Sequence, residues 1–127
     1  GGAGMGVFTA AKEAKDVYVI GCDADQFDDG RNGDANIILT SSLKVMDKND
    51  ARVLRDIAAG KFTGGNYHLG AVEDSIDYVK TPGRHQLTDD VIAKIDSALA
   101  LMKAGKILPA SSYSGTMPDN FTGLDAE

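Results

Sequence analysis

Two charged residues, Asp23 and Lys44, stand directly after hydrophobic runs of the chain and have the chemistry to bind a sugar. Asp23 follows the run VYVIGC, and Lys44 follows the run IILTSSL. An ionised carboxylate accepts hydrogen bonds, and its two oxygens can take both hydroxyls of a vicinal diol such as that of ribose. A cation near a helix N-terminus is electrostatically unfavourable, so we expect Lys44 to have a partner, either Asp23 or a sugar oxygen. The alternatives are a solvated loop acid and a surface lysine. Asp25, just beyond, either caps the loop or serves the site.

The glycine-rich segment GGAGMG at residues 1–6 precedes a stretch with helical spacing of apolar residues. Glycines let a ligand approach the backbone closely, and a helix N-terminus offers free N–H groups to oxygen atoms. We therefore expect Gly2, Gly4 and Gly6 to line the same ligand site as Asp23. A tight strand-to-helix turn without any ligand is the alternative interpretation.

The pattern of apolar residues predicts strands that alternate with helices. The predicted helices cover residues 7–15, 43–59 and 89–104, and the predicted strands cover residues 17–22, 37–40, 66–72 and 106–108. Residues 73–87 are rich in turn formers. This order predicts an α/β fold with a mostly parallel sheet flanked by helices. Ligands bind at the carboxyl ends of strands in such sheets, so we expect the three polar segments to form one small-molecule site.

We expect residues 1–109 to form one α/β domain and residues 110–127 to form an extended or disordered tail. The tail segment is rich in serine, glycine and aspartate and nearly lacks bulky apolar side chains. A glycine turn of this kind normally follows a strand. The domain is therefore expected to be a fragment that is incomplete at its N-terminus.

The composition disfavours several classes of function. The net charge is −6 and lysine and arginine form no cluster, which argues against nucleic-acid binding. No apolar run approaches the roughly 20 residues of a membrane helix. The sequence contains no Ser/His/Asp spacing, metal-ligand cluster or Walker loop, so we predict neither an enzyme nor a metal or other cofactor. Cys22, the single cysteine, is expected to be a small buried residue of its strand.

A dinucleotide site is the main alternative. Asp23 lies about 20 residues beyond the glycine segment, where the ribose-binding acid of an NAD-dependent oxidoreductase would stand. The motif G-x-G-x-x-G fits neither possible frame, because Val7 occupies the third glycine position when the motif starts at Gly2. A third hypothesis is a sensor or interaction domain with the same fold and a degenerate site.

Several motifs together resemble a known family. The segments GGAGMGVFTAAKEA, VYVIGCDADQ, ILTSSLKVMD and AAGKFTGGNYHLG occur in this order. Over residues 1–111 the chain resembles the carboxyl-terminal half of the basic membrane protein family of ABC-transporter substrate-binding lipoproteins, which includes purine nucleoside receptor A. The pairing of V-I-G-x-D-x-D-Q with T-S-x-x-K-x-x-D is quite specific, whereas the glycine segment alone is not. Cys22 stands where the family usually has valine.

The resemblance implies a type I periplasmic-binding fold, in which two lobes close over a nucleoside and the complex docks on an ABC permease in the membrane. It implies an extracytoplasmic protein that is lipid-anchored when complete. It also implies that Asp23 and Lys44 bind the ribose and that the segment Gly2–Gly6 lines the same cleft. The base would be held mainly by the amino-terminal lobe, so this chain would carry half of the site. A lobe without its partner is also expected to be able to form a homodimer through its exposed cleft face.

Overall fold

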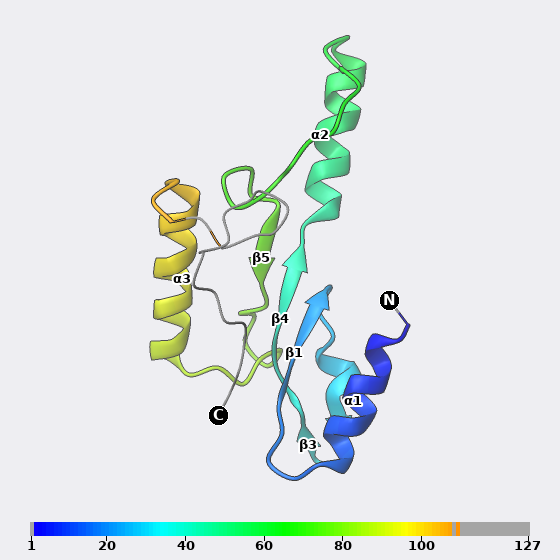
Figure 1. Ribbon diagram of the computed structural model, residues 1–127, viewed down its shortest axis with the longest axis vertical. Coiled ribbons are helices and arrows are strands. Elements are labelled where there is room, and N and C mark those ends of the chain that lie inside the picture. The colour runs from blue at the N-terminus through cyan, green and yellow to red at the C-terminus, as the bar shows by residue number, and fades with distance from the viewer. Residues whose placement is uncertain (1, 108, 110–127) are drawn as a thin grey trace, which may run out of the picture.

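The computed structural model describes residues 2–107 and 109 of the chain. Its elements follow in the order α1 (Gly4–Glu13), β1 (Val19–Asp23), η1 (Phe27–Gly30), β2 (Arg31–Asn32), β3 (Ala35–Asn36), β4 (Ile38–Lys44), α2 (Met46–Ala58), β5 (Ile76–Tyr78) and α3 (Asp89–Lys103) (Figure 1). The predicted tail at residues 110–127 lies outside the described residues. The short strand predicted at residues 106–108 is absent at residues 106 and 107, and Leu108 also lies outside the described part.

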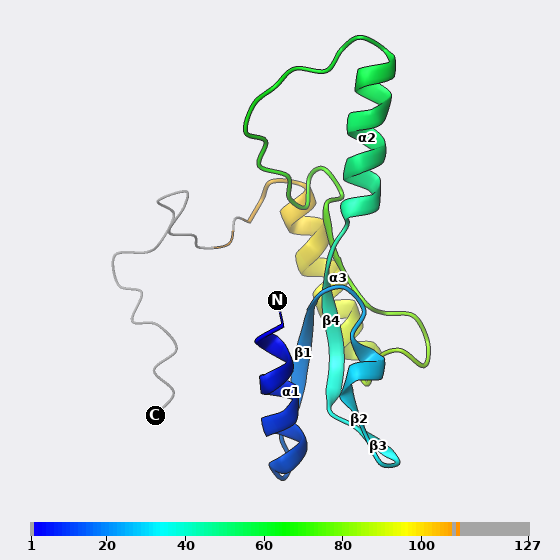
Figure 2. The same cartoon turned by 90° about the vertical axis from the view of Figure 1, so that its right-hand side faces the viewer.

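A three-stranded sheet with the order β1-β4-β5 forms the centre of the fold. Strands β1 and β4 are parallel, whereas β4 and β5 are antiparallel. Helix α1 lies alongside β1, helix α3 lies alongside β5, and helix α2 extends beyond the carboxyl end of β4 (Figures 1 and 2). The short strands β2 and β3 pair with each other as a separate hairpin. The predicted α/β class, with a sheet flanked by helices, is confirmed. The sheet is mixed and not mostly parallel, because β5 runs antiparallel to β4.

The strand predicted at residues 66–72 is wrong, and β5 forms a few residues later, inside the segment predicted to be turns. A tight turn reverses the chain first: Ser75 N donates to the carbonyl of Gly70, and Asp74 adopts a left-handed φ of 54°. Only after this turn does the backbone reach β4, where Val79 N donates to the carbonyl of Ser41. Pairing with a distant strand therefore decided the position of β5, and local propensity did not.

Two helix boundaries also differ from the sequence-based expectation. Helix α1 begins at Gly4, so part of the expected glycine loop is helical, and Asp16 with φ 57° follows its end. Helix α2 begins at Met46, because Lys44 still belongs to β4. Gly60 has φ 65° and follows the end of α2, as its sequence position predicts.

One cluster of the core lies between α1 and the start of β4. It consists of buried side chains with two half-buried ones packed against them: Phe8, Ala11, Ile37, Ile38, Val19 and Phe27. The expectation that Cys22 is buried is wrong, since its side chain is exposed. Ile20, on the same face of β1, is 60% exposed. Within the described part of the chain β1 is an edge strand, and this face of it has no element packed over it.

Candidate functional site

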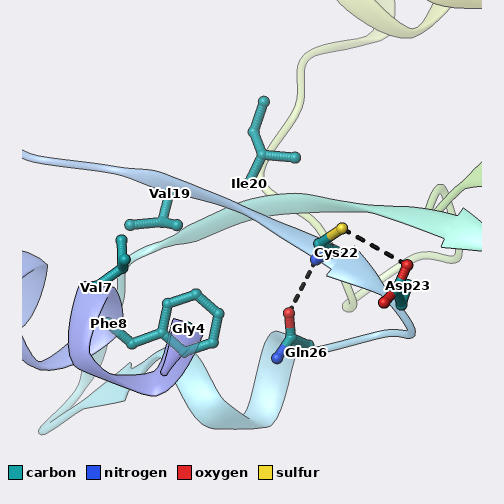
Figure 3. A pocket seen from close by; sticks show the side chains of 8 residues that line it. All are labelled: Gly4, Val7, Phe8, Val19, Ile20, Cys22, Asp23 and Gln26. Atoms are coloured by element: carbon teal, nitrogen blue, oxygen red, sulfur yellow. Dashed lines mark hydrogen bonds between the residues drawn. The ribbon is translucent and has the colours of Figure 1, made fainter. Parts of the chain in front are cut away.

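A hollow of about 210 Å³ lies between the start of α1 and the carboxyl end of β1 (Figure 3). One wall is apolar and comes from the helix and the strand, whereas the far end is polar. The lining residues are Gly4, Val7, Phe8, Val19, Ile20, Cys22, Asp23 and Gln26. The hollow thus joins Gly4 of the glycine segment to Asp23 at the strand end, and ligand binding by these residues stays a prediction.

Asp23, which lines this hollow, forms an ion pair with Lys44. Lys44 Nζ lies 3.1 Å from Asp23 Oδ1, and the side chains are 57% and 51% exposed. The two residues end neighbouring parallel strands, and Asp23 is in register with Leu43. The hydrogen bond and the charge of Lys44 hold the pKa of the Asp23 carboxyl below its ordinary value. The expected pairing is confirmed, and it presents an ionised acceptor beside a cationic donor.

The backbone of Asp23 has an uncommon conformation. Its φ is 72°, in the left-handed region that residues other than glycine rarely adopt. Asparagine and aspartate tolerate this region best, but surrounding contacts must still hold the residue there. The thiol of Cys22 lies 3.7 Å from Asp23 Oδ1 and is directed at the same carboxylate (Figure 3).

Gln26 closes the turn that follows β1, and sequence reasoning missed it. Its side-chain Oε1 accepts a hydrogen bond from the amide of Cys22 at 2.8 Å. Its own amide donates to Ser41 Oγ at 3.1 Å, which ties the turn to β4. The signal available in the sequence was the position of this glutamine, directly after the two acids in the segment DADQ.

Asp25 belongs to a different network. Its Oδ1 accepts from the amide of Phe27 at 3.0 Å, and its Oδ2 accepts from Arg84 Nε at 2.8 Å. The same guanidinium donates to Asp28 at 2.7 Å and lies 5.5 Å from the ring centroid of Phe27. The hydrogen bond from Arg84 holds the pKa of Asp25 below its ordinary value. Of the two roles expected for Asp25, the loop cap is the one that its contacts support, and a ligand role remains a prediction.

The three glycines have different surroundings. Gly4 lines the hollow, whereas Gly6 lies inside α1 and its amide already donates to the carbonyl of Ala3. Gly2 precedes the helix, and its carbonyl accepts from the amide of Met5. A Cβ on any of the three would meet no atom within 4 Å. The space above this helix start is therefore open to a ligand.

Within residues 2–107 and 109, no group of three His, Cys, Asp or Glu side chains is close enough to hold a metal ion. The helices in this described part of the chain are all too short or too polar to cross a membrane.

Comparison with protein families identifies the relatives of this chain. The model of the Bmp family, described as ABC transporter substrate-binding protein PnrA-like, matches residues 1–107. The chain belongs to the Bmp family. Two curated relatives, the CD4+ T-cell-stimulating antigens of Listeria monocytogenes and Listeria innocua, are each 34% identical to it over 110 residues. These matches cover 76% of this chain and 30% of each relative, so the chain spans less than a third of the length of these proteins.

Membership of the Bmp family confirms the resemblance and the periplasmic-binding fold inferred from the motifs. The family consists of extracytoplasmic substrate-binding components of ABC transporters, which are not catalytic. It therefore favours the binding hypothesis over the NAD-dependent oxidoreductase.

Proposed function

We propose that this chain is the carboxyl-terminal lobe of an ABC-transporter substrate-binding protein and that it binds a nucleoside, preferably a purine nucleoside, through its ribose. The observation that carries the proposal is the Asp23–Lys44 pair, 3.1 Å apart at the ends of two parallel strands. Asp23 of this pair lines an open hollow at a helix start, and this is the edge at which α/β sheets bind ligands.

In the proposed binding mode, two side chains of opposite charge bind different oxygen atoms of the same ribose. Asp23 accepts hydrogen bonds from the 2′- and 3′-hydroxyls, and Lys44 donates to an oxygen of the same ribose. The backbone at Gly2 and Gly4 approaches the 5′ end, while Gly6 leaves the first turn free of a side chain. Asp25 contributes from the loop wall, held by Arg84. No cofactor takes part.

The base would be held by an amino-terminal lobe, and closure of the two lobes over the ligand would present the complex to a membrane permease. Ligand shifts the population toward the closed state because only there do both lobes contact it. The proposed setting is extracytoplasmic, with a lipid anchor on the full-length protein. A homodimer of this lobe is a further proposed state, supported by exposed apolar side chains on β1 such as Ile20.

An NMR titration of the isotope-labelled chain with inosine, adenosine, ribose and NAD tests the proposal. We expect the nucleosides to shift the signals of Gly2, Gly4, Asp23 and Lys44, and ribose to shift the same signals at higher concentration. A response to NAD alone would favour the oxidoreductase alternative. Silence with all four compounds would contradict binding by this lobe alone.

A further inference from the structure

We propose that Gln26 is the positioning residue of this site: it holds the turn after β1 in the one conformation that puts the Asp23 carboxylate beside Lys44. The effect of Gln26 on ligand affinity rests on the proposed function, whereas its effect on the conformation of Asp23 does not.

Gln26 forms hydrogen bonds with three elements at this corner, β1, β4 and η1. Its Oε1 accepts from the amide of Cys22 in β1 at 2.8 Å, and its backbone amide donates to Ser41 Oγ of β4 at 3.1 Å. Its Nε2 donates to Asp29 in η1 at 3.4 Å. The first contact closes the backbone from Cys22 to Gln26 into a ring, and Asp23 is the second residue of that ring (Figure 3).

Gly21, Ser41 and Gln26 are also tightly packed against one another at this corner. A Cβ built on Gly21 would lie 2.3 Å from Ser41 Oγ and 3.1 Å from Gln26 Cβ, so only glycine leaves room for both side chains. Ser41 is fully buried and in register with Gly21. The Ser41 hydroxyl that accepts the hydrogen bond from the Gln26 amide is therefore fixed, and Gln26 is anchored to the central strand β4 of the sheet.

Asp23 needs such an anchor because of its backbone. With φ at 72° it occupies a region that costs free energy for a residue with a Cβ and persists only when its surroundings impose it. The hydrogen bond to the Cys22 amide holds the Gly21–Cys22 peptide, one residue before Asp23, and closes the turn that contains Asp23. Without that bond Asp23 can relax to a negative φ, and its carboxylate then points away from Lys44.

Glutamine suits this role better than the amino acids that are closest to it in size or charge. Asparagine is one methylene shorter and does not reach the Cys22 amide from the same backbone. Glutamate retains the acceptor, but it brings a second negative charge toward Asp29 and Asp23. Methionine keeps the length and loses both the acceptor and the donor, so Gln26→Met isolates the hydrogen bonds from the packing.

The test uses the isotope-labelled 127-residue chain, with adenosine and ribose as probes, in wild type, Gln26→Met, Asp23→Asn and the double variant. In Gln26→Met we expect the backbone chemical shifts of Asp23 to leave the left-handed pattern and its carboxyl pKa to rise toward 3.8. We expect adenosine affinity to fall about tenfold, which is about 1.4 kcal/mol. In the Asp23→Asn background the same substitution should cost no further affinity, because Gln26 acts through Asp23.

Unchanged Asp23 shifts and an unchanged pKa in Gln26→Met would overturn the proposal, as would affinity losses that add in the double variant. If the wild type binds neither probe, binding by this lobe alone is contradicted, but the Asp23 shifts and pKa still decide the role of Gln26. If Gln26→Met does not fold, Gln26→Asn provides the same test, because its shorter side chain does not reach the Cys22 amide. Asp23 should again lose the left-handed pattern of backbone shifts, and unchanged shifts would contradict the proposal.

Discussion

Lys44 Nζ lies 3.1 Å from Asp23 Oδ1, although the two residues belong to different strands, and both side chains remain about half exposed. Parallel strands bring their carboxyl ends to the same edge of a sheet, so β1 and β4 deliver the two charges to one place. Exposed ion pairs contribute little to stability. The pair is therefore better explained by what it can bind than by what it stabilises.

Removing the acid should affect binding and leave folding intact. We expect Asp23→Asn to lower the affinity for adenosine at least tenfold, because the amide has only one acceptor oxygen for the ribose hydroxyls. Asp34→Asn is the matched control, since Asp34 is an exposed acid in the β2–β3 turn, away from the hollow. Both changes can be measured by NMR titration and thermal unfolding. Equal affinities for the two variants would refute the assignment of Asp23.

Removing the lysine should change the acid titration of its partner. Lys44 lowers the pKa of Asp23 below 3.8, so Lys44→Met should raise it toward that value. The lowered pKa means that this pair stabilises the fold above about pH 4 and that the contribution is lost as pH falls through the folded-state pKa. A carboxyl-detected NMR titration measures the shift. An Asp23 pKa that stays low in Lys44→Met would show that another group holds the charge.

Arg84 should set the acid stability of the loop after β1. Its guanidinium lowers the pKa values of Asp25 and Asp28, and both effects stabilise the folded state above about pH 4 and vanish as pH falls through the lowered values. Arg84→Met should therefore reduce the thermal stability at neutral pH and make it less sensitive to acid. Melting curves at neutral pH and near pH 3 provide the measurement. Lys94→Met, which removes an exposed cation 3.9 Å from Asp90, is the control.

Replacement by alanine should destabilise the protein at Gly21 and stabilise it at Gly6. Gly21→Ala forces a Cβ to within 2.3 Å of Ser41 Oγ, so we expect a loss of about 1–3 kcal/mol in the free energy of unfolding. Gly6→Ala adds a Cβ in open space on α1 and should stabilise the protein by roughly 0.5–1 kcal/mol. Denaturant unfolding of both variants distinguishes them. If Gly21→Ala left the free energy of unfolding unchanged, Ser41 and Gln26 would have to be able to move apart.

The phenol of Tyr78 should lose its proton only at high pH, because its pKa is raised. Burial, followed by its hydrogen bond to Asp96 at 2.8 Å, raises the pKa of Tyr78 to about 12. Stability from this group is complete below about pH 10 and is lost as pH rises through 12. Ultraviolet absorbance of the tyrosinate, with Tyr78→Phe subtracted, reports the midpoint. Asp96→Asn should lower it, and an unchanged midpoint would leave burial as the whole cause.

Local patterns in the sequence were enough for the elements that carry the site. The run before Asp23 and the run before Lys44 became the parallel strands β1 and β4, and the segment after Thr88 became helix α3. Hydrophobic runs and helical periodicity act over a few residues, so they can be recognised without the fold. The site at the carboxyl ends of the strands followed from the α/β class.

Contacts between distant segments decided the rest. Arg84 reaches Asp25 from 59 positions along the chain and draws that acid into the loop network. The exposure of Cys22 depends on what covers β1, and the place of β5 depends on a turn that brings it to β4. The sequence alone determined that a strand lies just before each of the two charged residues, because local patterning specifies strands, but it did not determine that β4 continues to Lys44. The tertiary structure alone decided that Gln26 holds the turn around Asp23 and that Arg84 holds Asp25, because those hydrogen bonds form only after the sheet has assembled.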